Sequence, residues 1–89
     1  MKKLATVQEV DNEGLISLLG KQVIVFCLNY IYAGTLEGVN ENCLKLENPS
    51  IVYETGAFSS SEFKDAQKLP FPQYIKLAAI ESYAETNKK

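Results

Sequence analysis

The sequence contains no histidine, no tryptophan and no arginine, and each absence narrows the chemistry that the chain can perform. Without histidine, the usual base beside a catalytic Ser or Cys is missing. All nine basic residues are lysine, against eleven acidic residues, and the net charge is −2. Duplex DNA is bound mainly by neutralising phosphates, so this composition disfavours it. A local single-stranded site depends less on net charge, because base stacking contributes there.

Cysteine and long apolar runs are also scarce. Cys27 and Cys43 have a spacing that matches no zinc motif, and both lie among apolar residues. We therefore expect buried free thiols, no metal site and no cofactor. No run reaches the roughly eighteen apolar residues of a membrane span, and the start MKKLATVQEV lacks the apolar segment of a secretory signal. These features, with no phosphate-cradling glycine loop, predict a cytoplasmic protein that does not contact membranes and is not an enzyme.

The chain does contain enough apolar sequence for one domain, with 46% hydrophobic residues among 89. Residues 1–10 are ambiguous and are treated as an N-terminal extension. The stretch DNEGLISLLG, residues 11–20, predicts a helix of about two turns, because Asp11 or Asn12 can cap its start and Gly20 can end it. Strand patterns follow at 21–29, 31–39 and 43–48. Pro49 interrupts the third, and residues 50–58 are extended again and can continue the same sheet.

The second half of the chain is less regular. Residues 55–72 form an insertion in which Ser59 and Glu62 fit a capping box, so we expect a short surface helix or a structured loop between the third and fourth strands. Residues 73–84 predict one long strand or two strands split near Ala78. Residues 84–89 are a polar tail that we expect to fray. The fold class is therefore mainly β, with an N-terminal helix and five short, strongly bent antiparallel strands.

Two stretches resemble the motifs of the Sm-like family, which comprises the Sm, Lsm and bacterial Hfq proteins. Residues 15–48 match the first motif at Leu19-Gly20, at the alternating Val23 and Val25, at Gly34-Thr35-Leu36 and at Leu46. Residues 74–83, YIKLAAIESY, resemble the second motif. The resemblance implies a single Sm-like domain over residues 1–89, a small open barrel in which Gly34, and Gly38 with it, allows a strand to bend.

Family members form closed rings, so the resemblance implies a homo-oligomeric ring of about five to seven copies. The fourth strand of one subunit would pair with the fifth strand of the next, which covers both unpaired edges of the open barrel. The candidate interface residues are Tyr74, Ile75, Leu77, Ile80 and Tyr83.

The resemblance also implies single-stranded RNA binding around the pore, at Asn40, Asn42 and Lys76, with Glu41 and Leu77 as neighbours. Asn42 stands where the family has a stacking aromatic residue, and Leu77 stands where it has glycine. Lys76 keeps the charge of the family's arginine but loses its planar fork. We therefore expect RNA binding in a weak or non-standard mode. The alternative is an oligomeric scaffold or protein-interaction module that has lost RNA binding, with the insertion as its partner surface.

Ordinary structural explanations compete with these roles. Asn40 to Asn42 has the composition of a tight turn, because asparagine tolerates left-handed backbone conformations. The five tyrosines are suited to packing and interfaces, although Tyr30 and Tyr32 can form an exposed platform near the first turn.

Overall fold

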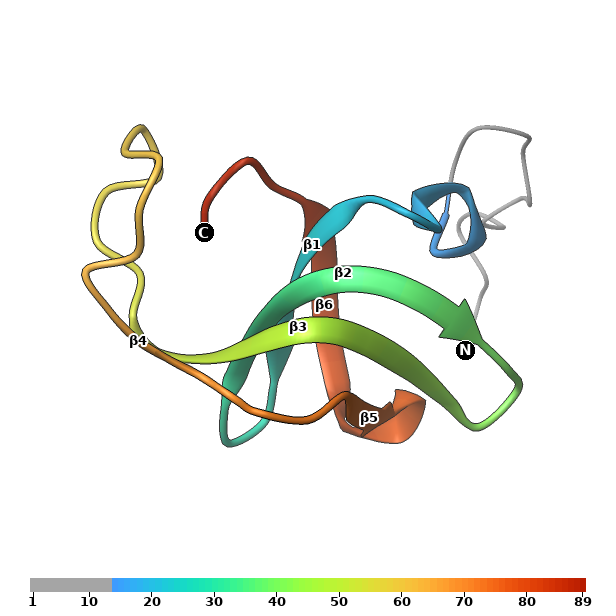
Figure 1. The fold of residues 1–89 in the computed structure, drawn as a ribbon. Coiled ribbons are helices and arrows are strands. Elements are labelled where there is room, and N and C mark those ends of the chain that lie inside the picture. Colours follow the sequence, from blue (N-terminus) through green and yellow to red (C-terminus); the bar gives the residue numbers. More distant parts are fainter. Residues whose placement is uncertain (1–13) are drawn as a thin grey trace, which may run out of the picture.

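The computed structural model describes residues 14–89, and within them the regular secondary structure is almost entirely antiparallel strand (Figure 1). The strands, which take up 54% of these residues, are β1 (Gln22–Cys27), β2 (Ile31–Val39), β3 (Cys43–Glu54), β4 (Asp65–Lys68), β5 (Gln73–Lys76) and β6 (Ile80–Glu85). Two 3₁₀ turns, η1 (Ile16–Leu18) and η2 (Leu77–Ala79), complete the elements. The mainly β class predicted from the sequence is confirmed.

The strands form one open sheet in the order β4-β3-β2-β1-β6, and β5 also pairs with β3. The long β3 strand therefore serves two partners: its first half pairs with β5 and its second half with β4. η2 joins β5 to β6, which returns to pair with β1 on the far side of the sheet. Of the two sequence alternatives for residues 73–84, the one that forms is the division near Ala78 into two strands, β5 and β6.

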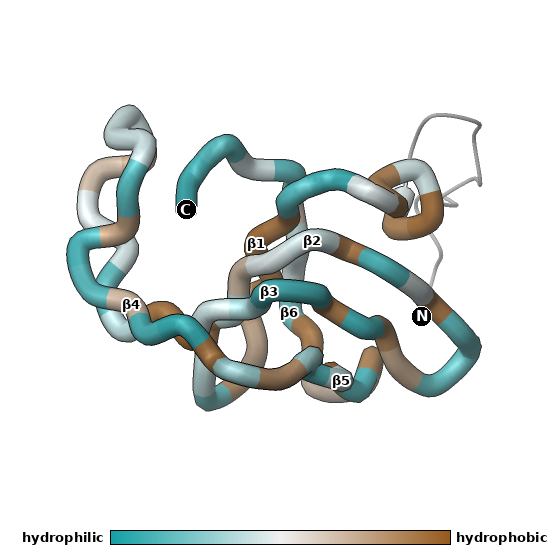
Figure 2. The backbone as a smooth tube through the Cα atoms, viewed as in Figure 1, coloured by the Kyte–Doolittle hydropathy of each residue, from teal (hydrophilic) through white to brown (hydrophobic). Residues whose placement is uncertain are grey.

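The core lies inside this curved sheet, where apolar residues from β1, β2, β3 and β5 meet. Its buried members are Val23, Val25, Leu36, Leu44, Leu46 and Ile75. Ile24, Ala33 and Val52 are buried on the opposite face, so β1 is covered on both faces at its centre, as its uninterrupted apolar sequence predicted. Figure 2 shows the apolar sequence of β1 as a brown segment of the backbone.

Gly34 lies where β2 crosses β3 most closely. The register shifts between Ala33 and Thr35, which is a β-bulge, and a Cβ at Gly34 would lie only 3.0 Å from the main-chain oxygen of Glu47. A side chain here would crowd the main chain of β3, so glycine favours the close approach at which the sheet bends. A second register shift lies between Leu36 and Gly38, but a Cβ at Gly38 would meet no atom within 4 Å. Glycine is sterically favoured at the first position only.

Pro49 does not interrupt the third strand, and the residues after it continue in the same sheet, which was one of the sequence alternatives. β3 runs through it to Glu54, because the preceding Asn48 adopts a left-handed conformation with φ 49° and places Pro49 within the bulge. Proline lacks an N–H, and a bulge is a position in a sheet where that donor is not needed. Its carbonyl accepts a hydrogen bond from the Leu69 amide at 2.9 Å.

The helix predicted over residues 11–20 is not formed in the described part of this segment. Residues 14–20 contain only η1, and residues 11–13 lie outside the described residues, as does the 1–10 extension. Gly14 and Gly20 both have φ 85°, in the left-handed region. A right-handed helix cannot pass through either glycine, so only one turn fits between them. Gly20 does end that turn, as the sequence predicted.

The insertion at 55–72 contains a strand rather than a short helix. β4 pairs with the second half of β3, with Ala66 opposite Val52 and Gln67 opposite Ile51. The predicted capping box is absent: the Ser60 hydroxyl, not that of Ser59, bonds the main chain of Glu62. A helix this short is barely stable, whereas the open edge of β3 supplies main-chain partners. The sheet consequently has six strands instead of five.

The polar tail packs against the rest of the chain. Ala84 and Glu85 belong to β6, and the Thr86 amide bonds the Gln22 carbonyl at 2.9 Å. Lys88 is 2% exposed. Among residues 14–89, no helix is long and apolar enough to cross a membrane.

Candidate functional site: a hairpin turn, a strand end and a tyrosine-lined cavity

The structure brings together the two segments that carry the sequence-predicted RNA site. The β2–β3 turn lies beside the end of β5, where Cys43 is paired with Lys76. The Leu77 amide donates a hydrogen bond to the Asn42 carbonyl at 2.9 Å. Asn40, Glu41, Asn42 and Lys76 are exposed, and Leu77 is half-buried against the core. These residues therefore form one continuous surface at the hairpin end of the sheet.

The side chain of Asn40 has a structural role in this surface. Its Oδ1 accepts hydrogen bonds from the amides of Asn42 at 2.7 Å and Cys43 at 2.9 Å. Its own amide donates to the Cys43 carbonyl at 2.9 Å, which closes the hairpin. This geometry is the turn chemistry expected of asparagine. A ligand at Asn40 would meet only the Nδ2 group, since the oxygen is already shared by two donors.

The outer face beside the turn holds a compact charge cluster. Lys45 Nζ lies 3.1 Å from Glu37 Oε1 and 3.4 Å from Glu47 Oε1, and 5.8 Å from the centre of the Tyr74 ring. The hydrogen bond from Lys45, followed by one shared with Glu47, lowers the pKa of Glu37. The hydrogen bonds that Lys45 makes with Glu37 and, second, with Glu47 raise the pKa of Lys45. The charge of Lys45 is thereby balanced by two carboxylates. Lys76 makes no ion pair within residues 14–89.

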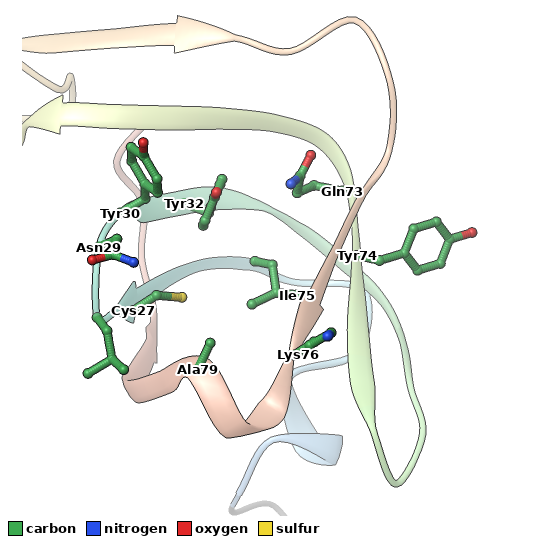
Figure 3. A pocket seen from close by; sticks show the side chains of 10 residues that line it. Cys27, Asn29, Tyr30, Tyr32, Gln73, Tyr74, Ile75, Lys76 and Ala79 are labelled. Carbon is green, nitrogen blue, oxygen red and sulfur yellow. The ribbon is translucent and has the colours of Figure 1, made fainter.

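A cavity of about 230 Å³ lies between the β1–β2 turn and the β5–η2 junction. It is lined by residues of these segments: Cys27, Leu28, Asn29, Tyr30, Tyr32, Gln73, Tyr74, Ile75, Lys76 and Ala79. Figure 3 shows Cys27 and Ile75 pointing into the space, whereas the Tyr74 ring points away from it. The cavity is smaller than a typical pocket for a drug-sized ligand, which suits it to one small planar group.

Two tyrosines form the outer wall of this cavity. The rings of Tyr30 and Tyr32 lie 6.3 Å apart and are tilted by 55°, and Tyr30 is 53% exposed. The sequence suggested an exposed platform built from both residues, but only Tyr30 is exposed and Tyr32 is half-buried. Burial, with smaller effects from Cys27 and Tyr30, raises the pKa of Tyr32. Its hydroxyl therefore stays protonated at neutral pH and can donate a hydrogen bond.

Cys27 is not activated as a nucleophile. Burial, followed by the negative charge of Glu81, raises the pKa of its thiol. A reactive cysteine needs the opposite, because the thiolate is the nucleophile and requires nearby positive charge. Both cysteines are free, and within residues 14–89 no group of three or more Cys, Asp or Glu side chains is arranged to hold a metal ion.

The five candidate interface residues fall into two groups. Ile75 is 5% exposed and packs in the core of its own chain, with Leu77 and Ile80 packed against that core. Tyr74 and Tyr83 are 64% and 38% exposed. Only the two tyrosines present their side chains to a neighbour, although β5 and β6 each have just one strand partner within the described residues.

Sequence reasoning missed several lining residues, among them Asn29, Gln73 and Ala79. For Gln73 a signal existed, because the alternation of QYIK places it on the same face as the core residue Ile75. Comparison of the chain with protein-family models and with curated protein sequences gives no match.

Proposed function

We propose that this chain is a subunit of an Sm-like ring that binds single-stranded RNA. The observation that carries the proposal is the Asn42–Leu77 main-chain bond, which joins the loop after the second strand to the turn between the last two strands. RNA pockets of the Sm-like family are built from these two segments. Within residues 14–89, β5 and β6 each have an unpaired edge, and a closed ring would cover both, which supports assembly.

RNA would be held in a non-standard mode, with the tyrosine-lined cavity in place of a stacking residue in the turn. Tyr30 offers a ring face to one base, and the Gln73 and Asn29 amides offer donors and acceptors to its edge. Lys76, free of ion pairs among the described residues, would contact a phosphate. A single cation per subunit makes the contact weak, and repetition around a ring raises its total strength.

The test is a titration of the purified protein with labelled uridine-rich and adenine-rich RNA at low and moderate salt. Tyr30→Ala should weaken binding by about 1–3 kcal/mol per base contacted, and Lys76→Met should weaken it while reducing its salt dependence. Lys64→Met is the matched control, because Lys64 is an exposed lysine of the insertion. The insertion loop lies at the opposite end of the molecule from the β2–β3 turn (Figure 1). The absence of binding to either RNA at low salt would end the RNA proposal.

A second candidate function is an oligomeric scaffold or protein-interaction module without RNA binding. The insertion favours it, because β4 has one free edge among the described residues and Phe58 in the adjoining loop is 66% exposed. Free edges and exposed aromatic residues are typical of surfaces that dock other proteins. An intact ring that binds neither RNA would support this function over the first.

A further inference from the structure

The least expected group in the molecule is the ammonium of Lys88. Its Nζ donates to three main-chain carbonyls, those of Ala57 at 2.7 Å, Ser60 at 2.8 Å and Glu62 at 2.8 Å. A lysine ammonium has three N–H donors, so all of them are used. The Phe63 ring lies beside it, with its centre 5.6 Å from Nζ. No carboxylate of residues 14–89 pairs with this charge.

The loop that surrounds Lys88 has little else to hold it. The side chains of residues 56–62 are all exposed, so the loop contributes nothing to a hydrophobic core. Its internal main-chain bonds run from the Ser60 amide to Ala57 and from the Lys64 amide to Thr55. Two further bonds tie it to the tail, from the Phe63 amide to the Lys89 carbonyl and from the Lys89 amide to the Ser61 carbonyl. The conformation of the loop therefore depends on the tail.

We propose that the carbonyls of Ala57, Ser60 and Glu62, with the Phe63 ring, form a cation-binding cup specific for a primary ammonium group, and that Lys88 occupies it as an internal ligand. Three converging carbonyl dipoles and an aromatic face replace the water that the ammonium loses on burial. The cup exists because the chain turns between residues 57 and 62, and the bound cation closes the loop onto the tail.

Closure has a structural consequence on the neighbouring sheet face. Phe63 and Lys89 are two walls of a polar cavity of about 210 Å³, whose other walls are Gln22, Ala33, Thr35, Asn48, Ser50 and Lys68. When the ammonium leaves the cup, these two walls are released together. The exposed Phe58 in the same loop loses its fixed position as well.

The wild-type protein provides the first test, by NMR of its lysine side chains. The ammonium protons of Lys88 should exchange with water at least about tenfold more slowly than those of the exposed Lys89, because all three are hydrogen-bonded and buried. Equal exchange rates for the two neighbouring lysines would overturn the proposal.

The second test uses Lys88→Ala, with Lys89→Ala as the matched control. Hydrogen exchange at the Ser60, Phe63 and Lys64 amides should accelerate at least about tenfold in Lys88→Ala alone, while the β2 and β3 amides stay protected. Methylammonium should restore protection of the loop in a saturable manner, and tetramethylammonium, which has no donor, should not. Unchanged loop exchange in Lys88→Ala, or equal effects of the two ions, would show that the cup does not bind ammonium.

Discussion

Gly34→Ala tests whether the close approach of two strands is what bends the sheet. An added Cβ would lie 3.0 Å from the Glu47 carbonyl oxygen, 3.1 Å from Pro49 Cα and 3.2 Å from Leu46 Cβ. Two of these atoms belong to the backbone and the third to a fully buried side chain, so none can move aside freely. Such overpacking costs about 1–3 kcal/mol.

The opposing effect is the lower conformational entropy of the unfolded alanine chain, which stabilises by about 0.5–1 kcal/mol. The net loss should be about 1 kcal/mol, which corresponds to a Tm lower by about 4–8 °C for a domain of this size. Thermal unfolding followed by circular dichroism measures it, at one fixed protein concentration because assembly would shift Tm.

Gly38→Ala is the matched control in the same strand. Nothing lies within 4 Å of a Cβ at that position, so the substitution should leave Tm unchanged or raise it. If Gly34→Ala melts at or above the wild-type temperature, the explanation of the bend by close approach is wrong.

Two further predictions concern the hairpin and the charge cluster. Asn40→Ala removes the acceptor of two main-chain hydrogen bonds and should lower the free energy of unfolding by about 0.5–2 kcal/mol. Asn40→Asp keeps the acceptor and should change that free energy little. Chemical denaturation measures both variants. NMR titration should find the pKa of Glu37 below the ordinary glutamate value, and Lys45→Met should raise it, whereas Lys21→Met, which removes the partner of Glu85, should not. Because the folded pKa is lowered, the stabilisation from this pair is present above the ordinary glutamate pKa and is lost as the pH falls through the folded value. A Glu37 pKa that does not respond to Lys45→Met would contradict this assignment.

The strands were predictable where the pattern was local. The bounds of β2 and the turn at Asn40 follow from β-propensity and from asparagine chemistry. Pro49 misled the prediction because its compatibility with β3 depends on the left-handed Asn48 and on a bulge opposite Gly34, which are features of strand pairing. β4 was missed for the same reason, since its exposed sequence forms a strand only against the edge of β3.

The candidate site was predictable in part. The resemblance between motifs placed Asn42 and Lys76 in one region, and the chain does bring them together. The cavity needs the β1–β2 turn and η2 to meet, which no single stretch reveals. No sequence pattern indicated that Lys88 is buried, because a lysine in a hydrophilic tail ordinarily lies in water (Figure 2).

The central claim is that the open edges of β5 and β6 pair between copies of this chain. The most direct test is the native mass of the purified protein at micromolar concentration, by light scattering or native mass spectrometry. The account predicts one species of about five to seven times the chain mass of 9.9 kDa, because a closed ring leaves neither edge free. A mass equal to a single chain would contradict it.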